Sequence, residues 1–593
     1  MNTTLRQAQG KGCIQCSANF VTEDKDLELY EKASPRLKGK YWHIPSPTLC
    51  PDCRVQRRMG WRNDRTFYHR KCDLSGKQII SIYPENTPFP VYHQSEWYGD
   101  KWDPMGYGQE YDFSRPFFEQ WHALMLKVPR LGMDLVNCEN SDYCNYCGDD
   151  KDCYLDIAGE ANEDCFFDLF TKYSRDCIDC TFAYHSELCY ECIQCYGCHT
   201  CRNSMYLDDC SDCAFCFDCK GCRNCLLCTN LRNKEYCILN EQHTKEECQA
   251  KLAELNLGSN NALRSVFDIW KKMRIERGIY RDMYNLSCED CTGNDIKNSR
   301  DCHHCFNATN CEDSKYLYDV LDAKDCQDLN YSLYKPEAAY ELISTLSMKF
   351  SAFNMASHYC VNVYYCDLTN NSKNLFGCIA LNHKEYCILN KQYTKKEYED
   401  LVPRIIVHMQ KTGEWGQFFP LSICPFGYNE TVAQEYMPLT RKDVESRGWR
   451  WAEEQKAEKE YMGPKVEVIS VRKFSSANYP GNPTKSSRRS SSSTKSLESP
   501  FRSAPPSSAT KIAMCCAILV HCGNGHAASV EKACRRVTIR RDRRRSTVRS
   551  VTSIPSIENV VCRISGNPQG GETQSFIRTD QHVTFHIPYS TYA

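Results

Sequence analysis

The cysteines with the clearest chemical signature are two Cys-x-x-Cys pairs near the N-terminus. Cys13 and Cys16 form the first pair, and Cys50 and Cys53 form the second. Each pair can place two thiolates on one ion, and four thiolates complete the tetrahedral shell of a structural Zn²⁺ site. We therefore predict one structural zinc ion that stabilises the fold rather than activating water. The alternative to a zinc site is that these four residues are free cysteines of the core. Cys72 has no partner at this spacing and is not counted as a ligand.

A basic and aromatic segment follows the second pair, over residues 54–71. Basic side chains can hold phosphates while aromatic rings stack on unpaired bases, as in proteins that bind single-stranded nucleic acids. The alternative is a charged pair of strands whose arginines bridge to the acidic remainder of the chain. The candidate nucleic-acid contacts are Arg54, Arg57, Arg58, Trp61, Arg62 and Tyr68.

Most of the other cysteines lie in a segment that repeats every twelve residues. Eight cysteines follow this spacing and are called the ladder: Cys153, Cys165, Cys177, Cys189, Cys201, Cys213, Cys225 and Cys237. The residues halfway between successive ladder cysteines are mostly small. The quarter positions favour turn formers, as in Asp150, Asn162, Ser174, Ser186, Asp156 and Asp168. Two small inward residues per coil, separated by turns, predict a narrow two-sided β-solenoid in which cysteine serves as a small packing residue.

The residues after the ladder cysteines give this solenoid one largely apolar outer face, which we expect the chain itself to cover. The densest cysteines lie over residues 189–228. Soft thiolates stacked at turns can hold Zn²⁺ or Cu⁺ between coils, so metal storage or sensing is the alternative function. Free thiols explain the same residues equally well.

An internal duplication relates residues 228–247 to residues 378–397, displaced by 150 positions without a gap. Each copy ends in KEYCILN and then a capping box, Thr244 with Glu247 or Thr394 with Glu397, which predicts a helix that caps the last coil. The second copy has fewer cysteines, so thiol number is not essential to the fold. Its segment PEAAYELISTLSMKF, residues 336–350, is interpreted as an inserted helix.

The charges are divided unequally along the 593 residues. Residues 471–593 hold 19 basic and 6 acidic residues, whereas residues 1–470 hold 55 basic and 69 acidic ones. An acidic body is a poor general binder of nucleic acid. The absence of an eighteen-residue apolar run and of an apolar N-terminal stretch favours a soluble protein of the reducing cytoplasm without membrane contact. There, cysteines are more often ligands or packing residues than disulfides.

Long motifs resemble a family of Cys-rich proteins from ultra-small bacteria. They are IPSPTLCPDCRVQRRMGWRNDRTFYHRKCDLSGKQIISIYP, EWYGDKWDP, YDFSRPFFEQ and NLRNKEYCILN, and the resemblance covers residues 11–450. It implies an N-terminal zinc-binding module, Cys repeats and a C-terminal CPDCR-type module, with no established activity. A CaiB/BaiF label on such proteins would imply a CoA transferase, and no catalytic pattern here supports that. The tail departs from the family where the last module is expected.

These observations predict a mainly β protein with α caps, in which a zinc ribbon precedes narrow Cys-rich β-solenoid segments and a disordered tail. The expected parts are a zinc ribbon (1–83), an aromatic linker and helix (84–137), a Cys-rich solenoid (138–243), a helical cap (244–283), a second Cys-rich repeat (284–393), a helical C-terminal cap (394–470) and a basic tail (471–593), which we hypothesise to be a frameshifted zinc ribbon. The expected function is non-catalytic binding of protein or single-stranded nucleic acid. No small-molecule substrate is identified.

Overall fold

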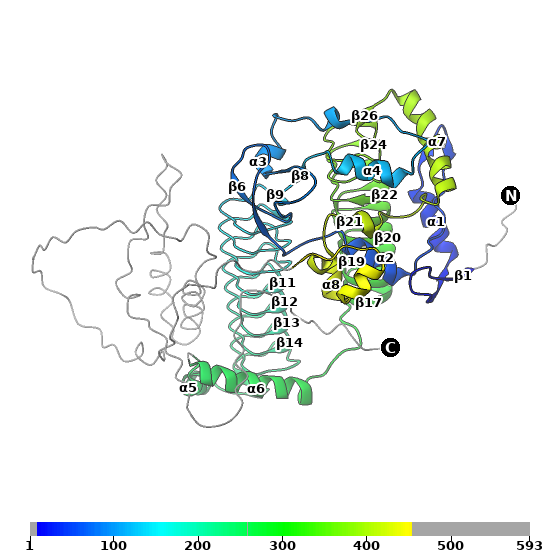
Figure 1. Cartoon of the computed structure of the whole chain (residues 1–593). Coiled ribbons are helices and arrows are strands. Elements are labelled where there is room, and N and C mark those ends of the chain that lie inside the picture. Colours follow the sequence, from blue (N-terminus) through cyan, green and yellow to red (C-terminus); the bar gives the residue numbers. More distant parts are fainter. Residues whose placement is uncertain (1–8, 258, 454–593) are drawn as a thin grey trace, which may run out of the picture. The chain divides into compact units, whose positions relative to one another are not determined.

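The structure is a computed structural model that describes residues 9–257 and 259–453, and the predicted basic tail lies outside them. Within these residues the chain divides into two units, one of residues 9–135 and 281–453 and one of residues 136–280. Most of the regular structure is β-strand (Figure 1). No helix in the described part of the chain is long and apolar enough to cross a membrane.

The first unit combines the N-terminal module with the second half of the chain. Its N-terminal elements are β1 (Gln9–Gly12), β2 (Asn19–Thr22), α1 (Asp24–Ala33), β3 (Arg36–Leu37), β4 (Lys40–Tyr41), α2 (Pro51–Met59), β5 (Tyr68–Lys71), β6 (Gln78–Ser81), β7 (Val91–Tyr92), α3 (Gln94–Trp97), the 3₁₀ helix η1 (Pro104–Tyr107), α4 (Phe117–Met125) and β8 (Arg130–Leu131). Its later elements are β17 (Glu289–Lys297), β18 (Arg300–Thr309), β19 (Glu312–Leu321), β20 (Lys324–Leu333), β21 (Glu337–Leu346), β22 (Lys349–Met355), β23 (Val361–Tyr364), β24 (Lys373–Phe376), β25 (Glu385–Ile388), β26 (Lys391–Gln392), α7 (Lys395–Thr412), η2 (Leu421–Ile423), η3 (Tyr428–Glu430), α8 (Val432–Tyr436) and α9 (Arg441–Ser446).

The second unit consists of short strands followed by two helices. Its elements are β10 (Cys147–Gly148), β11 (Thr181–Tyr184), β12 (Ile193–Tyr196), β13 (Met205–Asp208), β14 (Phe217–Lys220), β15 (Cys237–Ile238), β16 (Glu241–Gln242), α5 (Lys245–Leu255) and α6 (Asn260–Arg277). The two-residue strand β9 (Leu135–Val136) spans the boundary between the units.

The first parallel stack, residues 138–243, consists of layers of twelve residues that pair in parallel with the next layer (Figure 1). Strands β11 to β14 pair in sequence order, with Thr181 opposite Ile193. Isolated bridges extend the same register, as between Tyr154 and Phe166. The twelve-residue spacing expected from the ladder is therefore present, and all eight ladder cysteines are buried.

Each layer turns four corners rather than two. The corners of the layer 153–164 are Leu155, Ala158, Ala161 and Asp164, with φ between 52° and 57°. A left-handed conformation costs an L-residue about 1–2 kcal/mol, and hydrogen bonds between layers offset it. One such bond runs from the Tyr154 N–H to the Cys165 carbonyl at 3.0 Å.

Four corners leave four inward positions in each layer, which corrects the two-sided arrangement expected from the sequence. The quarter positions are inward residues with at most 3% exposure: Asp150, Asn162, Ser174, Ser186, Asp156 and Asp168. The corners lie two residues further on. A side of only three residues explains this, because each side then contributes one bridged, one corner and one inward residue.

The second parallel stack, residues 284–393, forms a sheet in which β17 to β26 pair in sequence order (Figure 1). Its interior contains fewer thiols and more aliphatic side chains, such as Leu317, Leu329 and Leu375. Cysteine is therefore not required at these inward positions, as the sparser cysteines of this copy predicted.

The segment 336–350 is not a helix, and this expectation was wrong. Residues Glu337–Leu346 form strand β21, which pairs in parallel with β20 and β22. The register between Lys324 and Glu337 is thirteen residues, so the layer absorbs one extra residue at Lys335, whose φ is 65°. Pairing on both edges outweighs the local helix propensity of this sequence.

Both stacks end in the same way, as the duplication predicted. The last parallel strand turns back in a short antiparallel hairpin, β15–β16 or β25–β26. The Asn240 side chain accepts a hydrogen bond from the Thr229 N–H at 2.8 Å, and Asn390 does the same for Ile379. Helices α5 and α7 then begin at the predicted capping boxes.

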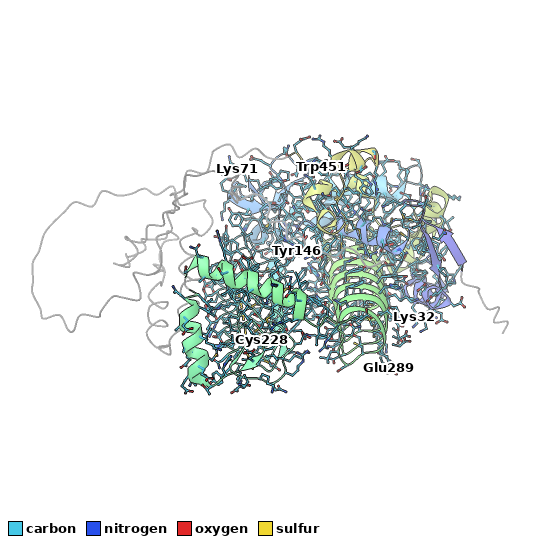
Figure 2. All side chains as sticks on the ribbon, turned by 90° about the horizontal axis from the view of Figure 1, so that it is seen from below. Lys32, Lys71, Tyr146, Cys228, Glu289 and Trp451 are labelled. Carbon is cyan, nitrogen blue, oxygen red and sulfur yellow. The ribbon has the colours of Figure 1, made fainter. Side chains whose placement is uncertain are left out.

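The outer face of the first parallel stack is covered in part by α5 and α6. Ala214, Leu226 and Ile238 on this face form one buried cluster with Cys248 of α5 and Trp270 of α6. Thiols fill the interior behind it, and Figure 2 labels Cys228 among the packed side chains. Part of the expected internal cover is thus provided by these helices.

Candidate metal centre

The two N-terminal Cys-x-x-Cys pairs come together in one cluster. The Sγ atoms of Cys13, Cys16, Cys50 and Cys53 all lie within 4.8 Å of one another. Cys16 and Cys50 approach to 3.6 Å between sulfur atoms. Cys16 is exposed and the other three are buried. The four residues predicted as a ligand set are therefore positioned to hold a metal ion.

Two different local structures present these thiols. The first pair lies in the turn between β1 and β2, where the Cys13 N–H donates to the Ala18 carbonyl at 2.9 Å. The second pair opens helix α2, with Cys50 as N-cap and Pro51 at the first helical position. The cluster is therefore built from a hairpin and a helix. The sequence predicted a zinc ribbon, and the alternative considered for residues 54–71 was a pair of strands. The structure instead places residues 51–59 in helix α2.

The surroundings shift the pKa values of Cys13, Cys50 and Cys53 in opposite directions. Burial acts to raise the pKa of Cys13, but N–H groups of Cys50, Cys16 and Gln15 outweigh it and lower the pKa to about 6. Burial raises the pKa of Cys50 to about 11 and also raises that of Cys53. The Cys13 thiolate is thus available near neutral pH, and a bound cation would be needed to keep Cys50 and Cys53 deprotonated as well.

Five of the six predicted nucleic-acid contacts are buried, and Arg57 is half-buried. Arg54, Arg58 and Arg62 have exposures of 1%, 0% and 3%, and Trp61 and Tyr68 lie below 10%. The indole of Trp61 donates to the Phe419 carbonyl at 3.3 Å, and the Tyr68 hydroxyl donates to Glu430.

The arginines of α2 pair with two acidic residues of the second parallel stack. Arg54 Nε lies 2.8 Å from Asp328 Oδ2, and Arg58 lies 3.3 Å from Asp328 Oδ1. Glu341 pairs with Arg57 at 2.8 Å and with Arg58 at 3.4 Å. Burial acts to lower the pKa of Arg54, but the charge of Asp328 outweighs it and raises the pKa. These ion pairs fix the metal centre's helix to the stack.

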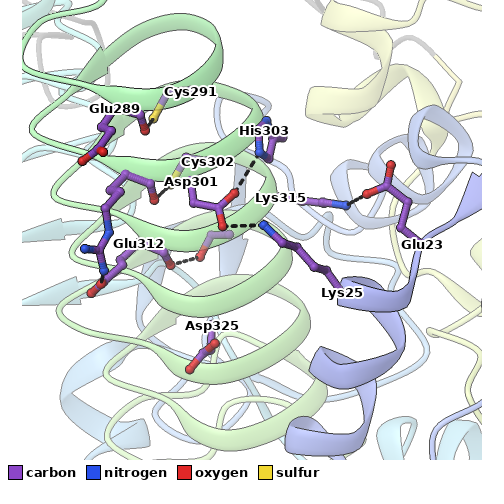
Figure 3. A network of polar contacts seen from close by, with 12 residues as sticks. Glu23, Lys25, Glu289, Cys291, Asp301, Cys302, His303, Glu312, Lys315 and Asp325 are labelled. Carbon is purple, nitrogen blue, oxygen red and sulfur yellow. Dashed lines mark hydrogen bonds and ion pairs between the residues drawn. The ribbon is translucent and has the colours of Figure 1, made fainter. Parts of the chain in front are cut away.

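Ion pairs, some of them exposed, join helix α1 and its N-cap to the same stack (Figure 3). Lys25 Nζ lies 2.7 Å from Asp301, and Lys315 reaches back to Glu23 and, at 3.0 Å, to Asp26. Asp301 also lies near Asp290 and His303, and the side chains of these three residues could serve as metal ligands. The lysine already neutralises Asp301, so we assign no metal to this group.

The placement of the arginines argues against the expectation that they contact nucleic acid. Charged groups buried in ion pairs cannot reach phosphates without breaking those pairs, which costs several kcal/mol. The alternative, in which arginines bridge to the acidic body, agrees with the observed pairs, although α2 rather than a strand presents them. The sequence did not identify Asp328 and Glu341, because no local pattern links them to residues more than 270 positions away.

We expect Arg57→Gln to leave the affinity for single-stranded RNA and its salt dependence unchanged, because Arg57 is committed to Glu341. If Arg57 contacted a phosphate, the slope of log affinity against log salt would decrease by about one. Fluorescence anisotropy with a labelled oligouridylate at several salt concentrations measures this. Lys71→Gln, at an exposed position of the same segment, is the matched control.

The ladder thiols act as hydrogen-bond donors inside the stack. Cys177 Sγ lies 3.5 Å from the Arg175 carbonyl and 3.6 Å from the Ser186 carbonyl, two residues before it and nine after it. Ser174 donates its hydroxyl to the carbonyls at the same offsets. Cysteine and serine therefore fill the same role at inward positions, which favours packing for the ladder.

Comparisons with known proteins do not assign this chain to a family. No family model and no curated protein matches it. Among solved structures, it is similar to the crystal structure of a "putative acetyltransferase" from Desulfovibrio desulfuricans G20, with 10% identity and a TM-score of 0.10. The similarity covers 51% of this chain and 63% of that one, less than two thirds of its length. A TM-score of this size supports no conclusion about fold or function.

Proposed function

We propose that the protein is a non-catalytic, zinc-stabilised scaffold that binds a protein partner. In this proposal both parallel stacks are narrow β-solenoids with twelve residues per coil. The regular parallel register, the four corners of each layer and the shared hairpin and helix at the ends support this assignment. A stack of this kind offers long, regular outer faces to a partner.

The observation that carries the proposal is the buried network around Asp328 and Glu341. Buried charges are expensive unless they are paired, and here they join the helix of the metal centre to the second parallel stack. These buried ion pairs thus hold the N-terminal module to the second parallel stack. Their role is architectural, because these charged groups pair with one another and none is left to bind a ligand.

We assign zinc to the four-cysteine cluster because four thiolates in a closed group are the ligands of a structural zinc site. The ion would connect the hairpin β1–β2 to the start of α2. Its chemistry is to hold the four thiolates and not to present an open coordination position. The ion would therefore support the same helix that carries Arg54 and Arg58.

We favour a protein over a nucleic acid as the partner. The arginines that could have bound phosphates are engaged within the molecule, and residues 1–470 carry a net negative charge, with 69 acidic against 55 basic residues. The outer sides of the stacks expose aromatic residues such as Tyr173 and Tyr359, and aromatic residues are enriched at protein interfaces.

Metal storage in the thiol-dense segment is the competing function. The hydrogen bonds argue against it, because Cys201 donates to the His199 and Cys210 carbonyls just as inward serines donate to theirs. The hydrogen bonds of a ladder thiol such as Cys201 satisfy it without a metal ion. We therefore place the ladder with the scaffold.

Metal loading distinguishes the two functions. The reduced, full-length protein is incubated with excess Zn²⁺ or Cu⁺, desalted, and its bound ions are counted by native mass spectrometry. A scaffold is expected to bind a fixed small number of ions that does not increase with supply. Cys201→Ser is the matched control, and it should leave the number unchanged. A number that increases with supply and falls in this variant would establish storage instead.

A further inference from the structure

A second group of side chains that could bind a metal ion lies inside the first parallel stack. Cys147, Asp150 and Asp156 place one ligand atom each within 4.8 Å of the others. Their exposures are 3%, 1% and 0%. Cys147 and Asp150 belong to one layer and Asp156 to the next, so the group connects two layers near the N-terminal end of the stack.

Two carboxylate oxygens in this group have no hydrogen-bond partner. Asp150 Oδ2 and Asp156 Oδ1 are both buried without one. The other oxygen of each carboxylate is held in place by Asn162. Its N–H donates to Asp150 Oδ1 at 3.0 Å, and its side-chain amide donates to Asp156 Oδ2 at 2.7 Å. The unpartnered oxygens are thus fixed in orientation and not free to rotate toward solvent.

In the ionised state these carboxylates have no counter-charge beside them. If both groups are ionised, two negative charges lie in the interior without a cation, because no ion pair to either is found among the described residues. A proton shared between the two carboxyl groups, which lie close enough to hydrogen-bond to each other, would satisfy one oxygen of each. A cation is the partner that would satisfy both carboxylates in their ionised form.

Cys147 is the third candidate ligand. In its thiol form, its Sγ lies 3.1 Å from the Asp156 carbonyl and 3.4 Å from the Asn145 carbonyl, and it would give up these hydrogen bonds on binding an ion as a thiolate. The Gly159 N–H donates to its sulfur at 3.3 Å, a hydrogen bond that stabilises a thiolate. Gly159 also leaves room for the Asp156 side chain, because a Cβ there would lie 2.3 Å from Asp156 Oδ2. The neighbouring residues therefore orient all three ligands, as the outer shell of a metal site does.

We propose that Cys147, Asp150 and Asp156 bind a divalent ion of the zinc type, separate from the four-cysteine cluster. One thiolate and two carboxylates suit a borderline ion better than Ca²⁺ or Cu⁺. Bonds of about 2.0–2.3 Å require the ligand atoms to approach by roughly 1 Å from their present limit. The ion ties the first layers together at the end of the stack opposite to α5.

Metal counting on variants of the full-length protein tests this site. The parent protein is expected to hold two zinc ions, measured by atomic emission and native mass spectrometry. Asp156→Asn keeps the shape and the contact with Asn162 but removes a ligand charge, so it is expected to hold one. Asp149→Asn is the matched control, because Asp149 is an exposed corner next to Asp150, and it should hold two.

The two metal sites can be separated from each other. Cys16→Ser should lose only the ion of the four-cysteine cluster, and cobalt substitution should then show the weaker thiolate-to-cobalt absorption of a single cysteine ligand. If Asp156→Asn does not fold, as judged by circular dichroism, Cys147→Ser provides the same test. A parent with one ion that is lost only in Cys16→Ser overturns this inference and leaves the zinc of the proposed scaffold intact. A parent with one ion lost only in Asp156→Asn supports this site and removes the other.

Discussion

Replacing Asp328 with alanine is expected to destabilise the unit of residues 9–135 and 281–453 by about 3–5 kcal/mol. Asp328 is fully buried, and both Arg54 and Arg58 pair with it. The substitution leaves two guanidinium groups in the interior with only Glu341 nearby, and burial of an unpaired charge is among the most costly changes in a protein. Guanidinium unfolding followed by tryptophan fluorescence measures the effect.

The matched control is Asp325→Ala, three residues earlier on the same strand. Asp325 pairs with Lys32 at 2.6 Å, but the lysine side chain is 50% exposed and the aspartate 22%. Exposed pairs contribute about 0–1 kcal/mol, so this variant should unfold almost as the parent does. Eight of the nine tryptophans lie in this unit and only Trp270 lies in the other, which makes fluorescence specific for it. Equal losses in both variants would contradict the role given to the buried network.

The sequence predicted those features that repeat at a fixed spacing. The ladder from Cys153 to Cys237 predicted the twelve-residue register, and Thr244 with Glu247 predicted the start of α5. Both depend on local patterns that one stretch of chain contains completely. The four-cysteine cluster was predictable for the same reason, since the chemistry of two Cys-x-x-Cys pairs specifies their association before any fold is known.

The shape of each layer was not predictable from the spacing alone. A period of twelve is compatible with two sides of six or four sides of three, and turn-forming residues such as Asp150 fit a corner as well as an interior. The distinction depends on left-handed backbone at residues such as Leu155 and Ala158, which are not residue types that favour it. The stacking of neighbouring layers imposes this conformation.

Long-range pairing was the other feature beyond the reach of the sequence. An arginine-rich segment with aromatic residues has the same composition whether it binds RNA or an acidic partner within the chain. The position of Asp328 opposite Arg54 and Arg58 favours the partner within the chain, and it depends on how α2 packs on strand β20. The same holds for β21, because its helical propensity is overridden only by the strands on either side of it.

Cys53→Ser is expected to release the metal ion of the four-cysteine cluster and to loosen α2. Cys53 is three residues after the helix N-cap, and the ion-paired Arg54 and Arg58 follow it on the same helix. Structural zinc contributes on the order of 10 kcal/mol to the folding of small zinc modules, so loss of the ion should be felt throughout the N-terminal module. We expect loss of one zinc equivalent by atomic emission and faster hydrogen exchange over residues 51–59.

Cys72→Ser separates loss of a ligand from loss of a buried thiol. Cys72 is also buried, but it lies outside the cluster and accepts a hydrogen bond from the His93 N–H at 3.3 Å, which a serine oxygen can also accept. This variant should keep its zinc and its slow exchange in α2. If instead Cys53→Ser retains the ion, or if both variants lose it, the cluster does not bind the metal with four thiolates. The ordering of α2 must then come from its ion pairs with Asp328 and Glu341 alone.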